Sequence, residues 1–159
     1  MKPSPDTALQ HPLVGQRVDP IDSPALVVDL DAMERNITRM ADFARKHQVQ
    51  WRPHANAHRS AELALQMQRA GAVGACVQKI AEAEVLAAGG VRDITLTNQV
   101  VAYPKLLRVA RLAARLQAQG GRLALAVDSP EGITRLAEAM AQAAPQTRID
   151  VFVEIDVGH

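Results

Sequence analysis

Trp51–Ser60, with the sequence WRPHANAHRS, marks the change from a strand-like segment to a helix-like one. The apolar lead-in Val49–Trp51 stops at Arg52-Pro53, a polar turn follows, and Ser60 begins a run with helical spacing. A strand, a polar loop and a helix in this order are typical of a βα unit. In such units the loop after the C-terminal end of the strand commonly carries the catalytic and binding residues.

The alternation of strand-like and helix-like segments continues on both sides of this stretch. Upstream, Ala25–Leu30 is predicted to form a strand, and Asp31 is predicted to cap the helix that follows. Downstream, strands are predicted at 73–78, 93–97, 123–127 and 149–155, with helices at 60–69, 80–88, 104–116 and 129–140. Alternating strands and helices form a parallel sheet, and mostly apolar strands indicate that both faces of it are covered. The predicted fold class is therefore α/β.

Length and composition set limits on the class of protein. The chain has 159 residues, which favours one domain with an apolar core, and its proline-rich residues 1–20 are predicted to form an extended arm. A net charge of +1 gives no electrostatic footprint for nucleic acid or a membrane surface. The single cysteine, Cys76, excludes an intrachain disulfide and is expected to be buried and inert. Without a long apolar run or a visible secretory signal, a cytoplasmic protein is expected.

Polar residues stand at the C-terminal ends of several predicted strands. They are His54, Asn56, Gln78, Asn98, Asp128 and Asp156. Because the carboxyl ends of parallel strands meet at one rim of a barrel, we expect these side chains to surround one site. Asn98 and Asp128 are equally well explained as turn and helix-entry residues. Arg52, where the strand enters its loop, could bind a phosphate or a carboxylate, or form a structural salt bridge.

His54 and His58 are the candidate metal ligands of the turn. Histidines four residues apart share one face of a helix and could bind zinc there. However, Pro53 disfavours a helix at this point, and no third ligand is close in the sequence. We therefore predict loop histidines that form hydrogen bonds, and no metal site.

The same stretch resembles the R-P-H-x-K-x-H-K motif of D-threonine aldolases and D-serine dehydratase-like enzymes. Further segments that resemble this family are Gln78-Lys79 with Glu82-Ala83-Glu84, Asn98–Val101, Val127-Asp128 and Val153–Gly158. The resemblance implies a partial (β/α)8 barrel of the alanine racemase N-terminal type. Residues 21–159 would be the N-terminal portion of that barrel, without its later strands and without the β domain of the relatives.

The resemblance also implies a reaction. Enzymes of this family are lyases that use pyridoxal phosphate and act on small D-β-hydroxy amino acids. The aldolases give glycine and an aldehyde, whereas the dehydratases, which act on D-serine or D-3-hydroxyaspartate, give a 2-oxo acid and ammonia. The aldolase version is favoured here. The resemblance further implies a homodimer, and a divalent metal whose ligands lie in a C-terminal region outside this chain.

The site residues implied by the resemblance surround the cofactor. His54 would lie beside the reactive lysine, and the cofactor would be bound by Arg52, Gln78, Asn98, Asp128 and Asp156. Asn56 occupies the position of the lysine that binds the cofactor aldehyde, and a carboxamide nitrogen is not a usable nucleophile. We therefore expect negligible activity from this chain.

Other hypotheses remain open at the level of the sequence. Lys79 is the only lysine near the predicted rim, and it could replace the missing amine only if its side chain pointed inward. The chain could instead be a non-catalytic interaction remnant, because open sheet edges invite self-association. A non-catalytic carrier of pyridoxal phosphate is a third hypothesis, but Asn56 counts against it as well.

Overall fold

The computed structural model describes residues 13–158 and divides the chain into two compact units, Met1–Glu34 and Arg35–His159. The sheet and every candidate site residue lie in the second unit. The arm predicted for residues 1–20 falls largely outside the described residues. No helix within the described part of the chain is both long and apolar enough to cross a membrane.

The strand predicted at Ala25–Leu30 is wrong. Residues 25–29 have no regular secondary structure and form no ladder with any strand of the described chain, and helix α1 (Leu30–Lys46) already begins at Leu30. The cap of α1 is Asp29 rather than Asp31, because Asp29 Oδ1 accepts a hydrogen bond from the N–H of Ala32 at 2.9 Å. Leu26 is 91% exposed, so the apolar composition of this segment is not matched by burial.

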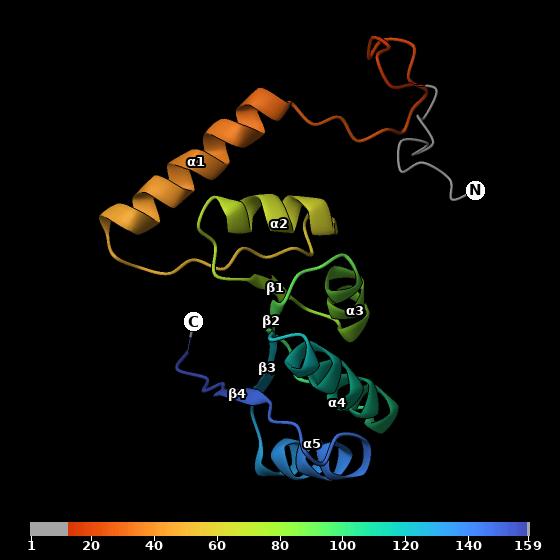
Figure 1. Ribbon diagram of the computed structural model, residues 1–159, viewed down its shortest axis with the longest axis vertical. Helices are drawn as coiled ribbons and strands as arrows, with labels where there is room; N and C mark the ends of the chain where they lie inside the picture. Colours follow the sequence, from red (N-terminus) through yellow and green to blue (C-terminus); the bar gives the residue numbers. More distant parts are fainter. Residues whose placement is uncertain (1–12, 159) are drawn as a thin grey trace, which may run out of the picture. The chain divides into compact units, whose positions relative to one another are not determined.

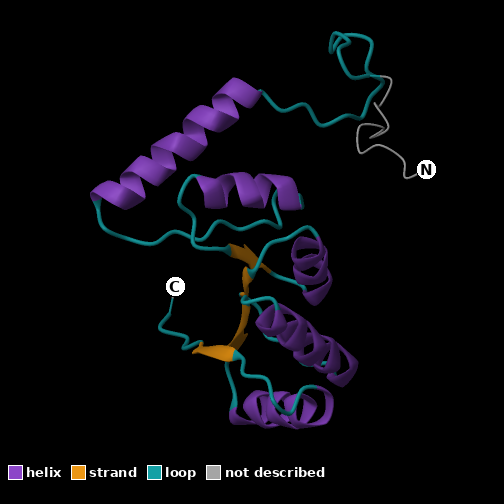
Figure 2. Cartoon of the chain, in the orientation of Figure 1, coloured by secondary structure: helices purple, strands orange, loops and turns teal. Residues whose placement is uncertain are grey.

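Four parallel strands form the sheet, in the spatial order β1-β2-β3-β4. The strands are β1 (Ala75–Val77), β2 (Asp93–Leu96), β3 (Arg122–Val127) and β4 (Asp150–Val153). Besides the part of α1 from Arg35 onward, the helices of this unit are α2 (Ala61–Arg69), which precedes β1, and α3 (Ile80–Ala88), α4 (Tyr103–Ala118) and α5 (Pro130–Ala143), which connect consecutive strands. The three connecting helices lie on one side of the strands (Figure 1), and Figure 2 shows helix and strand alternating from α2 onward. The α/β prediction is confirmed.

The apolar core lies between the sheet and the connecting helices. Ile94 and Leu96 of β2 and Leu123 and Leu125 of β3 are at most 2% exposed and belong to this core. The core residues of α4 are Leu106, Val109, Ala110, Leu112, Ala113 and Leu116. They recur at spacings of three and four residues, which places them on one face of the helix.

The opposite face of the sheet carries small side chains. Cys76, Thr95 and Ala124 lie side by side in register on β1, β2 and β3. Successive strand residues point to opposite faces, so these three face away from the core residues that alternate with them. Cys76 is buried, as predicted, and burial raises the pKa of its thiol. The thiol therefore stays protonated and unreactive.

The last strand differs from the other three because all four of its residues are exposed. Val151 and Val153 pair with Leu125 and Val127 of β3 and so continue the core face of the sheet. They remain 45% and 67% exposed. The prediction that apolar strands have both faces covered is therefore wrong for β4.

Candidate functional site

The turn that carries His54 and Asn56 is anchored to β1 by backbone hydrogen bonds. The N–H of Cys76 donates to Pro53 O, and the N–H of Ala55 donates to Cys76 O, both at 2.8 Å. His54 forms a single parallel bridge with Cys76, so the strand predicted at Val49–Trp51 is wrong and the pairing is displaced toward the turn. Asn56 lies two residues after this bridge, in the turn that follows it. Asn56 is half-buried, whereas His54 is exposed.

The turn closes directly onto α2. The N–H of Arg59 donates to Ala55 O at 2.7 Å, and Ser60 caps the helix by accepting a hydrogen bond from the N–H of Leu63 at 3.2 Å. The helix predicted from Ser60 is thus observed, with Ser60 as its cap. The polar turn is therefore fixed at both ends, by β1 on one side and by α2 on the other.

His58 adds a further constraint to this turn. Its Nδ1 accepts a hydrogen bond from the N–H of Ser60 at 3.1 Å. The proton of the neutral ring is therefore assigned to Nε2, which is buried and has no hydrogen-bond partner among the described residues. Burial lowers the pKa of His58 from its ordinary value of 6.5, although the Ser60 hydrogen bond acts in the opposite sense. The folded turn thus favours a neutral histidine.

We expect this neutral histidine to make the fold less stable in acid. Because the pKa of His58 is lower in the folded chain, the unfolded chain takes up the proton first as the pH falls below 6.5. The contribution of His58 to the free energy of unfolding is fully present above pH 6.5. It is lost as the pH falls toward the pKa that His58 has in the folded chain. Urea unfolding between about pH 5 and pH 8 measures the slope.

The control for this prediction is His58→Asn, whose side-chain oxygen can still accept the Ser60 hydrogen bond but does not titrate. This variant is expected to show a shallower loss of unfolding free energy in acid. Equal slopes for the two proteins would show that other groups cause the pH dependence.

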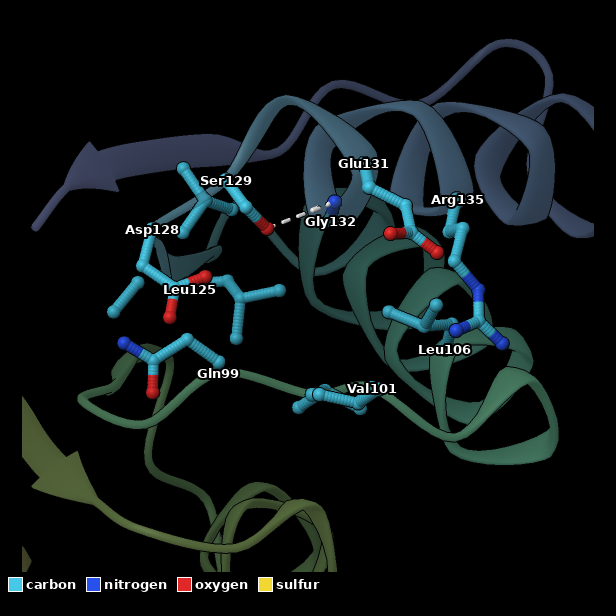
Figure 3. A pocket seen from close by; sticks show the side chains of 12 residues that line it. Gln99, Val101, Leu106, Leu125, Asp128, Ser129, Glu131, Gly132 and Arg135 are labelled. Atoms are coloured by element: carbon cyan, nitrogen blue, oxygen red, sulfur yellow. Dashed lines mark hydrogen bonds between the residues drawn. The ribbon is translucent and has the colours of Figure 1, made fainter.

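Two of the predicted rim residues come together at the ends of β3 and β4. Asp128 and Asp156 line one cavity of about 440 Å³, together with Gln99 and Glu154. Gln99 Nε2 donates a hydrogen bond to Glu154 Oε2 at 2.5 Å, and Figure 3 shows the side chains of Gln99 and Asp128 near each other. Three carboxylates share this cavity, so it favours hydrogen-bond donors and cations over anions.

Gln78 and Asn98 also follow their strands, as predicted, but both are exposed. The backbone N–H groups of Gln78 and Lys79 donate to Glu82 Oε2 at 3.0 and 3.2 Å, which fixes the start of α3. The side chain of Lys79 is exposed at this helix start. The structure thus places Gln78, Lys79 and Asn98 at helix and turn entries.

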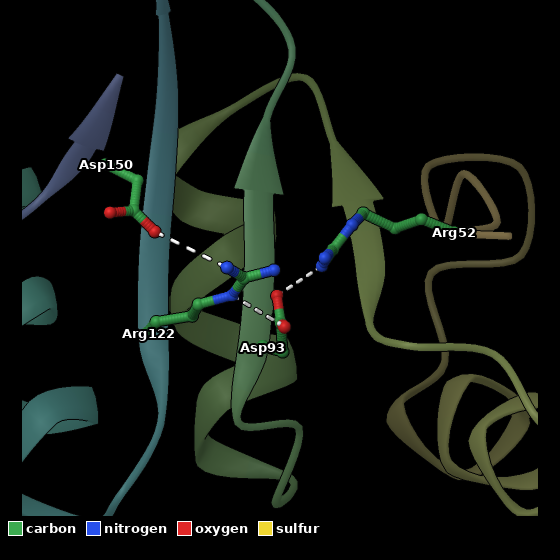
Figure 4. Close-up of polar contacts among 4 residues, drawn as sticks. All are labelled: Arg52, Asp93, Arg122 and Asp150. Carbon is green, nitrogen blue, oxygen red and sulfur yellow. Dashed lines mark hydrogen bonds and ion pairs between the residues drawn. The ribbon is translucent and has the colours of Figure 1, made fainter. Parts of the chain in front are cut away.

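Arg52 lies at the other end of the sheet, away from the strand ends that carry Asp128 and Asp156. It forms an ion pair with Asp93, the first residue of β2 (Figure 4). Asp93 also pairs with Arg122 at 2.8 Å, and Arg122 pairs with Asp150 at 3.6 Å. These four residues form what we call the strand-start network. Of the two interpretations of Arg52, the salt bridge is the one observed.

The sequence reasoning missed Gln99 and Glu154 as residues of the rim cavity. Each is adjacent or nearly adjacent to a residue that was singled out, because Gln99 follows Asn98 and Glu154 precedes Asp156 by two positions. In an extended segment, side chains two positions apart point to the same side. The two-residue spacing between Glu154 and Asp156 could therefore have identified Glu154 as a residue of the rim cavity.

The sequence of this chain matches a known protein family and several characterised proteins. The sequence matches the family described as alanine racemase, N-terminal domain, over residues 28–159. D-threonine aldolase from Arthrobacter sp. is 40% identical over 138 residues, which are 87% of this chain and 35% of that protein. 3-hydroxy-D-aspartate aldolase from Paracoccus denitrificans is 39% identical over 147 residues, which are 92% of this chain and 36% of that protein.

A solved structure agrees with these matches. The crystal structure of D-threonine aldolase from Filomicrobium marinum superimposes with a TM-score of 0.80 at 43% identity, covering 87% of this chain and 35% of that one. The chain therefore spans about a third of the length of the relatives it matches. With a parallel sheet, strands and helices that alternate from α2 onward, and a match over residues 28–159, the chain belongs to the alanine racemase N-terminal domain family.

Proposed function

We propose that this chain is a D-threonine-aldolase-like member of the lyases for D-β-hydroxy amino acids in which the covalent cofactor site is lost. The observation that carries the proposal is Asn56, which lies half-buried in the turn beside β1, at the position that the resemblance assigns to the family's lysine. The two aldolases named above support the aldolase version over the dehydratase version.

The residues of the turn do not fit covalent attachment of pyridoxal phosphate. Attachment requires an amine, and no lysine occurs between Trp51 and Gln78. Lys79, the first lysine after the turn, is exposed at the start of α3. The carboxylates of the rim cavity would repel a phosphate group. We therefore assign no catalytic step to the cofactor in this chain.

We retain the other rim residues as a proposed substrate-facing set. Asp128 and Asp156 share the rim cavity, where carboxylates would accept hydrogen bonds from the ammonium group of a D-amino acid. His54, Gln78 and Asn98 are exposed at neighbouring strand ends and would complete the set. Arg52 is left out of it because Asp93 pairs with it at the other end of the sheet.

Cofactor trapping tests the proposal directly. The purified chain is incubated with pyridoxal phosphate, reduced with borohydride and mapped by peptide mass spectrometry. We expect no site-specific adduct, because Asn56 offers no amine. With D-threonine as substrate, we expect glycine formation no faster than in a mock preparation.

A matched pair of variants makes the test specific to the position. Asn56→Lys is expected to gain an adduct that maps to residue 56. Asn98→Lys places a lysine after a different strand, at an exposed position, and is expected to gain no adduct beyond random surface labelling. A specific adduct on Lys79 of the unmodified chain, or turnover above the mock preparation, would contradict the loss of the site.

A further inference from the structure

A second cavity, of about 120 Å³, lies between the first turns of α4 and α5 at the end of β3 (Figure 3). We call it the α4–α5 cavity. Its apolar wall includes Leu106, Leu125 and Val127, which belong to the core between sheet and helices. It therefore opens on the helix side of the sheet, although it shares Gln99 and Asp128 with the rim cavity.

Opposite charges stand unpaired at this cavity. Glu131 and Arg135 are four residues apart on α5, a spacing that brings Cβ atoms within about 6 Å and commonly produces an ion pair. Among the ion pairs of the described residues, however, neither side chain takes part, and Asp128 takes part in none either. Figure 3 shows the guanidinium of Arg135 beside Leu106, with the carboxylate of Glu131 near it.

The burial of Arg135 gives this arrangement its significance. Arg135 is half-buried and lines the apolar wall, and its guanidinium forms no ion pair with any described residue. Its planar fork of donors matches a carboxylate. A ligand with only a carboxylate would also meet the negative charges of Glu131 and Asp128, so the matching ligand carries a positive charge as well.

We propose that the α4–α5 cavity binds the zwitterion of a small α-amino acid. Its carboxylate pairs with Arg135, and its ammonium group donates to Glu131 and Asp128. A cavity of about 120 Å³ is small, so the proposal is confined to amino acids with the smallest side chains. The proposal shares Asp128 with the substrate-facing set proposed above, but it uses no residue of the Asn56 turn and so does not rest on the loss of the cofactor site.

Titration of the isotope-labelled chain with glycine tests this assignment. Backbone amide shifts are followed by NMR up to about 20 mM glycine, at which a site with a millimolar Kd is largely filled. We expect saturable shifts confined to Val101, Ser129, Gly132 and their neighbours. Acetate and methylamine each carry one of the two charges, and we expect neither to reproduce these shifts in the same range.

Substitutions then separate a built site from general charge effects. Arg135→Gln and Glu131→Gln are each expected to weaken glycine binding by about tenfold or more, since each removes one charge partner. Arg111→Gln and Glu138→Gln remove the same charges from exposed positions that do not line the cavity, and they should leave binding unchanged. Circular dichroism confirms that each variant is folded.

Three outcomes would overturn the proposal. They are the absence of saturable shifts with glycine, equal shifts with acetate or methylamine, and unchanged glycine binding in folded Arg135→Gln and Glu131→Gln. None of these results depends on cofactor trapping at residue 56, so the two proposals fail independently.

Discussion

Replacing Gly74 with alanine is expected to lower the free energy of unfolding by about 3 kcal/mol, the upper end of ordinary overpacking costs. A Cβ at residue 74 would collide with the guanidinium of Arg52 and with the backbone carbonyl of Asp93. The Arg52 side chain is held by its ion pair, and the Asp93 carbonyl belongs to β2. Neither the guanidinium nor the carbonyl can move away without losing an interaction, so the sheet would have to separate locally around residue 74.

Urea denaturation of the parent and the variant measures this cost. Gly132→Ala is the control, because its Cβ would meet only the hydroxyl of Ser129 at 3.1 Å within the first turn of α5. That variant is expected to change the unfolding free energy by less than about 1 kcal/mol, since alanine favours the helix. A Gly74→Ala protein as stable as the Gly132→Ala protein would show that the collision is relieved at little cost.

Replacing Asp93 with alanine is the second large effect that we expect, at about 2 kcal/mol. Asp93 pairs with both Arg52 and Arg122, so its removal leaves two cations without their shared carboxylate. The side chain of Arg52 is only 17% exposed, and loss of a partner from a buried pair is costly. The figure lies below the full cost of a buried pair because solvent screens the more exposed Arg122.

Asp150→Ala is the matched control within the same strand-start network. Asp150 is 57% exposed and lies 3.6 Å from Arg122, so its removal should cost less than about 0.5 kcal/mol. Thermal and urea unfolding of both variants, at low and at high salt, provide the comparison. Equal costs for the two substitutions would mean that burial of Arg52 does not decide the energetics.

The fold was largely predictable because its signals are local. Helix caps and apolar spacing gave α2 to α5, and short apolar runs between them gave the four strands. The two false strands, Ala25–Leu30 and Val49–Trp51, have strand-like composition. Composition does not say whether a neighbouring strand is present to pair with, and pairing decides whether a segment becomes a strand.

The candidate site was predictable only where topology alone decides it. Asp128 and Asp156 follow adjacent parallel strands, so their approach needed no knowledge of side-chain packing. The position of Arg52 depended on the alignment of its segment with β1. Arg52 lies two residues before the bridge at His54, and this offset places it at the start of the sheet rather than at the rim. Such an offset is set by tertiary contacts that a single sequence does not display.

The exposure of β4 means that the sheet does not have one uniform stability. Opening β4 alone uncovers little apolar surface, since all its residues already contact solvent, whereas opening β2 requires separation from two neighbouring strands and from the core. The free energy of local opening therefore decreases from β2 toward β4. The rim cavity includes Glu154, the residue directly after β4. The shape of this cavity therefore depends on β4, the strand that opens most easily. Any ligand that holds this cavity together would also hold β4 against β3.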